Sequence, residues 1–181
     1  TWVDNNDVEF QFTQRDVDES FVRIPTPKAN HNQNLVPIFL VTIRQINGVR
    51  LPRPVVGLLD SGSSNTIVNK SSLPIGTPLI TTKDVRKTIT TQGTYNSDKV
   101  VFLSDITLPE FVNVRHIQGV AAHIFDSPTC PYDVIFGRVI LNAIGLKMDF
   151  ENDCIQWMDT IIEMKDIRMY DHIRNKGNDV A

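Results

Sequence analysis

The chain has 181 residues, of which 41% are hydrophobic, so length and composition favour one folded domain with a buried core over a disordered chain. It carries 18 Lys and Arg against 21 Asp and Glu, a formal net charge of −3, and lacks the basic surplus typical of nucleic-acid binders. No apolar run approaches the roughly 18 residues of a membrane span. We therefore expect no nucleic-acid partner and no membrane partner.

Residues 1–34 differ in composition from the rest of the chain. Acidic side chains are frequent at first, and Pro25, Pro27 and several asparagines follow. This composition predicts a linker or a mobile arm. The start of the chain has neither the basic nor the apolar region of a secretory signal, so we expect a cytoplasmic protein. In that setting Cys130 and Cys154 are predicted as two buried free thiols, with one disulfide as the alternative.

Strand-like patterns begin at residue 35 and continue through most of the chain. The predicted strands are rich in β-branched and aromatic residues and cover 35–43, 49–59, 66–68, 88–95, 99–103, 111–117 and 133–136. Asn47-Gly48 predicts a two-residue hairpin turn after the first of them. The stretch 55–59 is apolar on both faces and therefore predicts a strand in the interior of a sheet.

Helical spacing of apolar residues is found at 138–144, followed by Gly145 as a C-terminal cap. A second hairpin is predicted at 148–157. We therefore expect a mostly β domain over residues 35–164 with one short helix, and a polar tail at 165–181.

One short motif carries the chemistry. Asp60-Ser61-Gly62 directly follows the predicted interior strand. Burying a lone ionised carboxylate is costly, so an aspartate at this place needs an explanation. The simplest is an Asx-type turn, in which Asp60 caps the loop through its own side chain. A chemical role is the alternative, because a second apolar strand, ending in Gly137, lies well downstream and could close over the loop.

These residues resemble the motifs of retroviral-type aspartic proteases, the retropepsins. Leu58-Leu59-Asp60-Ser61-Gly62 is similar to hydrophobic-hydrophobic-Asp-(Thr/Ser)-Gly, and Val134-Ile135-Phe136-Gly137-Arg138 to hydrophobic-hydrophobic-Gly-Arg. The order of residues over 132–157 is most similar to proteases of gypsy-type LTR retrotransposons, and the resemblance covers about residues 35–164. It implies an all-β, retropepsin-like acid protease barrel with one short C-terminal helix, assembled as a homodimer.

A catalytic pair of aspartates requires two chains here, because this sequence holds a single Asp-Ser-Gly. We expect a two-fold symmetric dimer in which each chain contributes the catalytic Asp60, and the two carboxylates share one proton. By resemblance, Ser61 and Gly62 support the meeting of the two loops. A Ser63 hydroxyl aimed at the carboxylate would favour its ionised form, which predicts an acid-shifted pH optimum.

A hairpin over residues 86–100 is expected to close over the substrate as a flap. The residues expected to contact the substrate lie at its tip, which Gly93 makes flexible, and are Thr91, Gln92, Gly93 and Thr94. The candidate walls of apolar subsites are Val68, Ile89 and Ile135. An ordinary surface hairpin and ordinary core residues are the alternatives.

The resemblance implies an aspartic endopeptidase that binds an extended polypeptide and processes a retroelement polyprotein of the Gag-Pol type, in the cytoplasm or within virus-like particles. No cofactor is implied, and the four histidines lack metal-ligand spacing, so no metal is expected. Two alternatives remain. One is a non-catalytic domesticated copy that keeps the retropepsin fold for dimerisation or peptide binding; the other is an unrelated β-barrel binding protein with a chance Asp-Ser-Gly.

Overall fold

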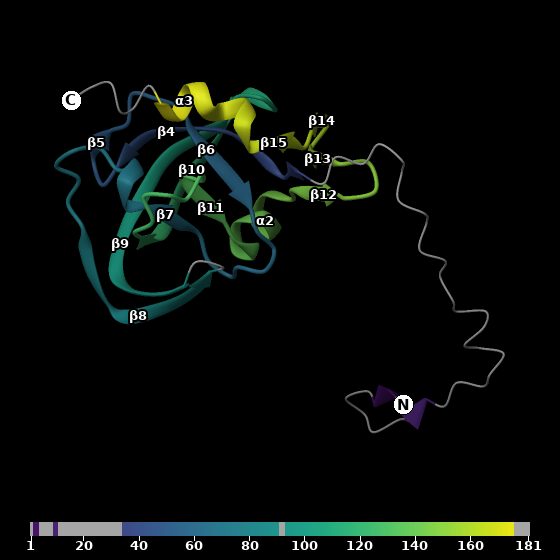
Figure 1. Ribbon diagram of the computed structural model, residues 1–181, viewed down its shortest axis with the longest axis horizontal. Helices are drawn as coiled ribbons and strands as arrows, with labels where there is room; N and C mark the ends of the chain where they lie inside the picture. Colours follow the sequence, from purple (N-terminus) through teal and green to yellow (C-terminus); the bar gives the residue numbers. More distant parts are fainter. Residues whose placement is uncertain (1, 4–8, 11–33, 91–92, 176–181) are drawn as a thin grey trace. The chain divides into compact units, whose positions relative to one another are not determined.

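The computed structural model describes residues 2–3, 9–10, 34–90 and 93–175 (Figure 1). The chain divides into two units, Thr1–Gln33 and Asn34–Ala181. In the first unit, β1 (Trp2–Val3) pairs antiparallel with β2 (Glu9–Phe10). In the second, none of the described helices is both long and apolar enough to cross a membrane.

A closed barrel of six strands forms the centre of the second unit. Its ring runs β4–β6–β11–β7–β10–β9 and closes where β9 pairs back onto β4, while β5 and β8 extend the same sheet at its two ends. The strands are β4 (Ile38–Ile46), β5 (Val49–Arg50), β6 (Val55–Leu59), β7 (Ile67–Asn69), β8 (Ile80–Thr90), β9 (Gly93–Leu108), β10 (Val112–Phe125) and β11 (Val134–Phe136). The predicted mostly β domain is confirmed.

The barrel interior is filled by apolar side chains from its strands. Phe39 on β4 is fully buried, and its ring lies 5.8 Å from that of Phe111 and 5.9 Å from that of Phe136. Burial of each such side chain contributes about 1.5–3 kcal/mol. The strand β6 lies between β4 and β11 and is buried along most of its length, which confirms the interior strand predicted from its apolar run.

Two local predictions are confirmed by backbone geometry. Asn47 and Gly48 both have positive φ, 48° and 81°, and Ile46 pairs with Val49 across the turn they form. The helix α2 (Arg138–Ile144) ends at Gly145, which has a φ of 72° and donates its N–H to the carbonyl of Leu141.

A three-stranded sheet follows α2. It consists of β12 (Lys147–Asp149), β13 (Cys154–Trp157) and β14 (Thr160–Glu163), in that order. The predicted hairpin is its first two strands; the third was not predicted. Trp157 is buried and donates its indole N–H to the carbonyl of Ile144 at 2.9 Å, which fixes this sheet to the end of α2. Cys154 on β13 and Cys130 are half-buried and form no disulfide.

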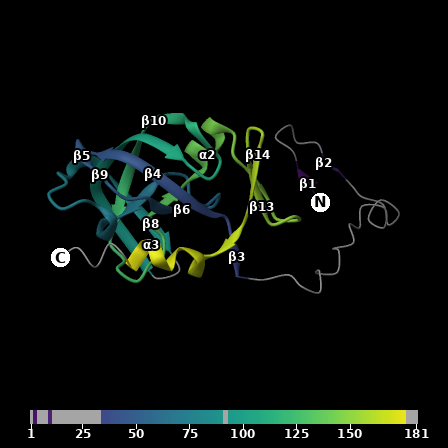
Figure 2. The same cartoon turned by 90° about the horizontal axis from the view of Figure 1, so that it is seen from above.

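The segment expected as a polar tail is structured through residue 175. β15 (Lys165–Asp166) pairs antiparallel with β3 (Leu35–Val36), as Figure 2 shows, and is followed by the 3-10 helix η2 (Ile167–Tyr170) and by α3 (Asp171–Asn175). The structure therefore has a second short α-helix, α3, although the sequence predicted only one helix and a polar tail at this place.

Tyr170 and Glu110 attach this C-terminal segment to the barrel. Tyr170 is only 5% exposed and packs with Ile38 and Val56. Its hydroxyl donates to Glu110 Oε1 at 2.8 Å, and the same carboxylate accepts the N–H of Leu40 at 2.6 Å and lies 3.3 Å from Lys165 Nζ. The sequence pattern did not indicate this burial, because the polar partner of Tyr170 lies far away along the chain.

Replacing Tyr170 by Phe is expected to lower the free energy of unfolding by about 1.5–2 kcal/mol at neutral pH, since a hydrogen bond to a carboxylate is lost. Burial, and then Glu110, raises the pKa of Tyr170. The folded state therefore prefers the protonated hydroxyl, so this contribution is full below about pH 10 and falls as the pH rises above it. Urea unfolding of both proteins at pH 7 and pH 10.5 should show the difference narrowing; a constant difference would contradict this.

Candidate active site

Asp60 lies at the end of β6, where the barrel strand leaves the sheet. Its N–H donates to the carbonyl of Phe136 on β11 at 3.0 Å, so its backbone still belongs to the barrel. The side chain is half-buried, and Oδ1 accepts the N–H of Gly62 at 2.8 Å. The Asx-type turn is therefore present. Oδ2 receives no hydrogen bond from any residue that the structure describes, so one carboxylate oxygen stays available for chemistry.

The loop that begins at Asp60 crosses directly over Gly137. β11 runs parallel to β6, with Phe136 opposite Leu59, and brings Gly137 under the loop. A Cβ on Gly137 would lie 2.5 Å from the carbonyl oxygen of Asn65, which only glycine avoids. The prediction that the second apolar strand closes over the loop is thus confirmed.

Carbonyl groups of the same loop satisfy the first N–H groups of α2. Arg138 N–H donates to the Ser63 carbonyl at 2.8 Å, and Val139 N–H to the Ser64 carbonyl at 3.2 Å. Helix N–H groups in the first turn have no partner within the helix, so these bonds serve as its cap. The loop, β11 and α2 therefore form one hydrogen-bonded unit that fixes where Asp60 lies.

The hydroxyl of Ser63 does not point at the carboxylate. It donates to the carbonyl of Asn65 at 2.8 Å, within the loop. The expectation that the Ser63 hydroxyl points at the carboxylate is therefore wrong for this chain, and the acid-shifted optimum loses the contact on which it was based. The physical reason is local: serine hydroxyls readily bond to backbone carbonyls nearby in sequence, and the turn places that of Asn65, two residues on, within reach.

Ser64 takes part in a contact that links the loop to α2. Arg138 Nη2 donates to Ser64 Oγ at 2.9 Å, a hydrogen bond within one chain from a charged donor to a neutral acceptor. Ser61 and Gly62 are exposed at the tip of the loop.

The predicted flap is part of a longer hairpin made by β8 and β9. Thr90 pairs with Gly93, so Gly93 is the first residue of β9 rather than the tip. Thr91 and Gln92, which join the two strands, lie outside the described residues. Thr94 is exposed. The long curved hairpin is drawn in blue-green in Figure 1.

The three candidate subsite walls have different environments. Val68 is 1% exposed and belongs to the main core. Ile135 is 8% exposed and packs in a separate small cluster with Ile67 and Phe125. The side chain of Ile89 lies outside the described residues.

Asp133 is a supporting residue whose role sequence analysis missed. Its Oδ2 accepts the N–H of Val56 at 2.8 Å, and its Oδ1 accepts the hydroxyl of Ser72. One carboxylate oxygen therefore binds β6, and the other binds the 3-10 helix Lys70–Ser72 that follows β7. A carboxylate beside an apolar strand, before the strand here and after it at Asp60, could have indicated it.

His123, on β10, lies beside the loop that ends at Thr66. Its backbone N–H donates to the Thr66 carbonyl at 3.1 Å, and its buried ring Nδ1 has no partner among the described residues. Burial, and then the charge of Arg86, lowers the pKa of His123, so the ring is neutral at pH 7. Within the described ranges, no three His, Cys, Asp or Glu side chains lie close enough to hold a metal ion.

Comparison with known proteins finds no matching family model, and no curated protein matches the sequence. Among solved structures, the chain is similar to the retroviral protease-like domain of Ddi1 from Leishmania major. The alignment covers 72% of this chain and 94% of that chain, with 15% sequence identity and a TM-score of 0.45.

Proposed function

We propose that the protein is an aspartic endopeptidase of the retropepsin type, in which Asp60 of two chains forms the catalytic pair. One observation carries the proposal. A half-buried carboxylate is fixed at the end of an interior strand, with Oδ1 held by Gly62 and Oδ2 unoccupied among the described residues. One chain supplies one such group, and acid proteolysis of this kind needs two.

The proposed reaction uses the two carboxylates in opposite protonation states. They share one proton, because like charges about 3 Å apart cannot both ionise. The ionised carboxylate takes a proton from water as the water oxygen attacks the amide carbonyl. The protonated carboxyl gives its proton to the carbonyl oxygen. In the collapse, the carboxyl that took the water proton gives it to the amide nitrogen, a hydroxyl of the tetrahedral intermediate returns its proton to the other carboxylate as the carbonyl re-forms, and the C–N bond breaks. The pair then again holds one proton.

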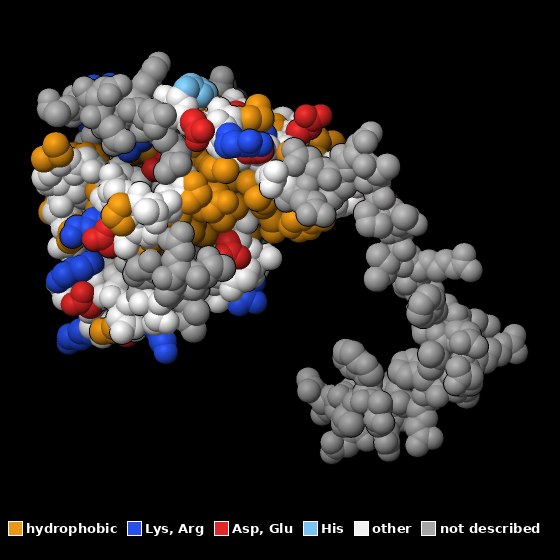
Figure 3. Space-filling model, viewed as in Figure 1, with side chains coloured by type: hydrophobic (Ala, Val, Ile, Leu, Met, Phe, Trp, Pro, Cys, Tyr) orange, Lys and Arg blue, Asp and Glu red, His pale blue; other side chains and the backbone are white. Residues whose placement is uncertain are grey.

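Exposed apolar surface near the loop supports assembly of two copies. Hydrophobic side chains gather on the face of the molecule where β6 ends and α2 begins (Figure 3). Val139 on α2, whose N–H donates to Ser64 of the loop, is 66% exposed, and the exposed residues Ser61 and Gly62 of that loop are small. Small exposed residues let two such loops approach closely, and contact would remove the apolar surface from water.

The proposed substrate is an extended polypeptide bound between the loop and the β8–β9 hairpin, held by strand-like hydrogen bonds. As a finer proposal, that polypeptide is a retroelement polyprotein of the Gag-Pol type, cut in the cytoplasm or in virus-like particles. Its support is the order of motifs over residues 132–157 and the intact Asp60-Ser61-Gly62.

The test combines the mass of the protein in solution with cleavage of a library of apolar decapeptides. We expect dimers over the concentrations at which peptides are cut, and a specific activity that falls on dilution as the dimers dissociate. Cleavage by a species that is monomeric throughout would contradict the shared pair. A stable dimer that cuts no peptide would instead identify a non-catalytic dimerisation module.

A further inference from the structure

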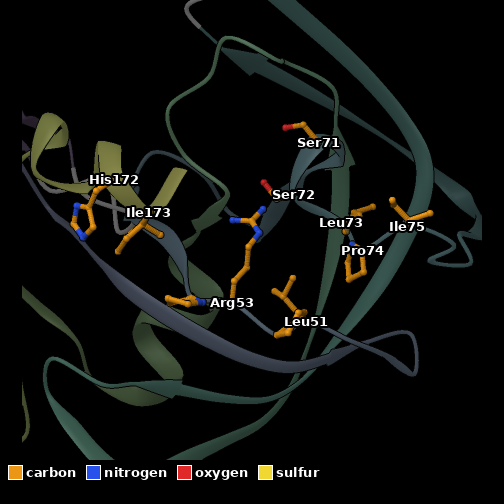
Figure 4. A pocket seen from close by; sticks show the side chains of 11 residues that line it. Leu51, Arg53, Ser71, Ser72, Leu73, Pro74, Ile75, His172 and Ile173 are labelled. Atoms are coloured by element: carbon orange, nitrogen blue, oxygen red, sulfur yellow. The ribbon is translucent and has the colours of Figure 1, made fainter. Parts of the chain in front are cut away.

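A groove of about 620 Å³ lies apart from the loop that carries Asp60. Three segments form its walls: residues 51–54 between β5 and β6, residues 71–75 around the 3-10 helix η1 (Lys70–Ser72), and residues 172–173 on α3 (Figure 4). Ligand sites for small molecules commonly measure about 300–1,000 Å³. The groove is therefore large enough to hold such a molecule.

Most of the lining is apolar. Leu51, Leu73, Ile75 and Ile173 contribute aliphatic side chains, and three prolines add rigid apolar surface. Ile75 is 98% exposed. An exposed apolar side chain in a concave apolar wall is surface that a bound hydrocarbon would remove from water.

Arg53 is the charged exception in this lining. Its side chain extends into the space between α3 and η1, toward Ser72, as Figure 4 shows. Arg53 is half-buried, and it forms no ion pair and no hydrogen bond with any residue in the described ranges. Partial burial without a partner is unfavourable for a guanidinium, which has five N–H donors to satisfy.

The nearby acid is already engaged. Ser72, toward which Arg53 points, donates its hydroxyl to Asp133, and the second oxygen of Asp133 accepts the N–H of Val56. Asp133 thus links β6 to η1 instead of pairing with Arg53. The guanidinium is left facing the groove with its donors available to an acceptor from outside the chain.

We propose that this groove binds an amphipathic monocarboxylate, a small molecule with an aliphatic or aromatic body and one carboxylate. The carboxylate would accept two parallel hydrogen bonds from Arg53, the geometry in which a guanidinium binds such groups most strongly. The apolar body would lie on Leu51, Leu73 and Ile173. One arginine in a mostly apolar lining, whose other polar members are Ser71, Ser72 and His172, matches a ligand with one anionic end.

The test uses octanoate as the probe, with 1-octanol and octylammonium as neutral and cationic controls of the same chain length. Amide chemical shifts of the isotope-labelled full chain would be followed during each titration. We expect octanoate to shift the amides of residues 51, 53, 71–73 and 173, and octanol and octylammonium to bind at least about tenfold more weakly.

Matched variants separate the charge from the shape of the groove. Arg53→Gln should weaken octanoate binding by about tenfold or more, and Arg53→Lys should retain part of it. Arg50→Gln, which removes an exposed arginine outside the groove, should leave binding unchanged. Asp60→Asn should also bind octanoate normally, so failure of the proposed proteolysis would not affect this result.

Three outcomes would overturn the proposal. Equal binding of octanol and octanoate would show an apolar groove without charge recognition. Equal affinity of wild type and Arg53→Gln would show that the guanidinium is not the anchor. Binding of a short acidic peptide, with no shift from octanoate, would show that the groove is a peptide site instead.

Discussion

Replacing Asp60 by Asn is expected to abolish peptide cleavage while leaving the fold intact. An amide can neither take a proton from water nor supply one to the carbonyl oxygen, and positioned proton transfer contributes about 10²- to 10⁴-fold to rate. We therefore expect kcat/KM to fall by at least about 100-fold. In wild type, Gly62 N lies 2.8 Å from Asp60 Oδ1. The asparagine Oδ1 can accept the same N–H, so the loop should keep its shape.

The measurement is cleavage of the peptides that wild type cuts, with urea unfolding as the check on stability. Asp159→Asn is the matched control, since Asp159 is an exposed aspartate at the turn between β13 and β14. It should cleave at the wild-type rate. Wild-type activity in Asp60→Asn would refute the assignment of this residue, whatever the oligomeric state.

Mixing the two proteins tests whether two chains share the site. After unfolding and refolding together in equal amounts, random pairing leaves about a quarter of the dimers with two copies of Asp60. Activity per total chain should then fall to about a quarter of the value for wild type alone. A fall to one half would mean that each chain acts independently, which would exclude the shared pair.

Features with local signals were predictable from the sequence. The turn at Asn47-Gly48, the helix α2 with its Gly145 cap, and the interior strand β6 each depend on residues within a few positions of one another. Turn geometry, capping and apolar runs are determined at that range, and all three are present. The position of Asp60 at the end of β6 followed from the same reasoning.

Features that depend on distant partners were not predictable. The barrel closes through pairs such as Ile43 with Ile106, and nothing near either residue indicates the other. Burial of Tyr170 depends on Glu110 in the same way. The prediction for the Ser63 hydroxyl was wrong for a different reason. Two acceptors were available to it, the Asp60 carboxylate and the Asn65 carbonyl, and only the three-dimensional turn decides between them.

The crossing of the loop over Gly137 leads to the second large expected effect. In Gly137→Ala, the new methyl group would lie 2.5 Å from the oxygen and 2.8 Å from the carbon and nitrogen of Asn65. All three are backbone atoms, so no side-chain rotation relieves the contact. Either the loop or β11 has to move, and both are bound by the hydrogen bonds from Arg138 and Asp60.

We expect Gly137→Ala to lower the free energy of unfolding by about 3 kcal/mol, the upper end of the range for overpacked sites. Because the displaced loop carries Asp60, cleavage should fall at temperatures where the variant is still folded. Urea unfolding and peptide cleavage on the same samples would measure both effects.

Gly119→Ala is the matched control, because its clash is as short but falls on a different kind of atom. A Cβ there would lie 2.4 Å from the ring of Phe102, a side chain that is 49% exposed, and 3.4 Å from the nearest backbone atom. We expect a loss below about 1 kcal/mol, because alanine is also favoured over glycine within a strand. Equal losses in the two variants would show that the backbone crossing at Gly137 does not constrain the loop, and Asp60 would then lack the fixed position that the proposed chemistry requires.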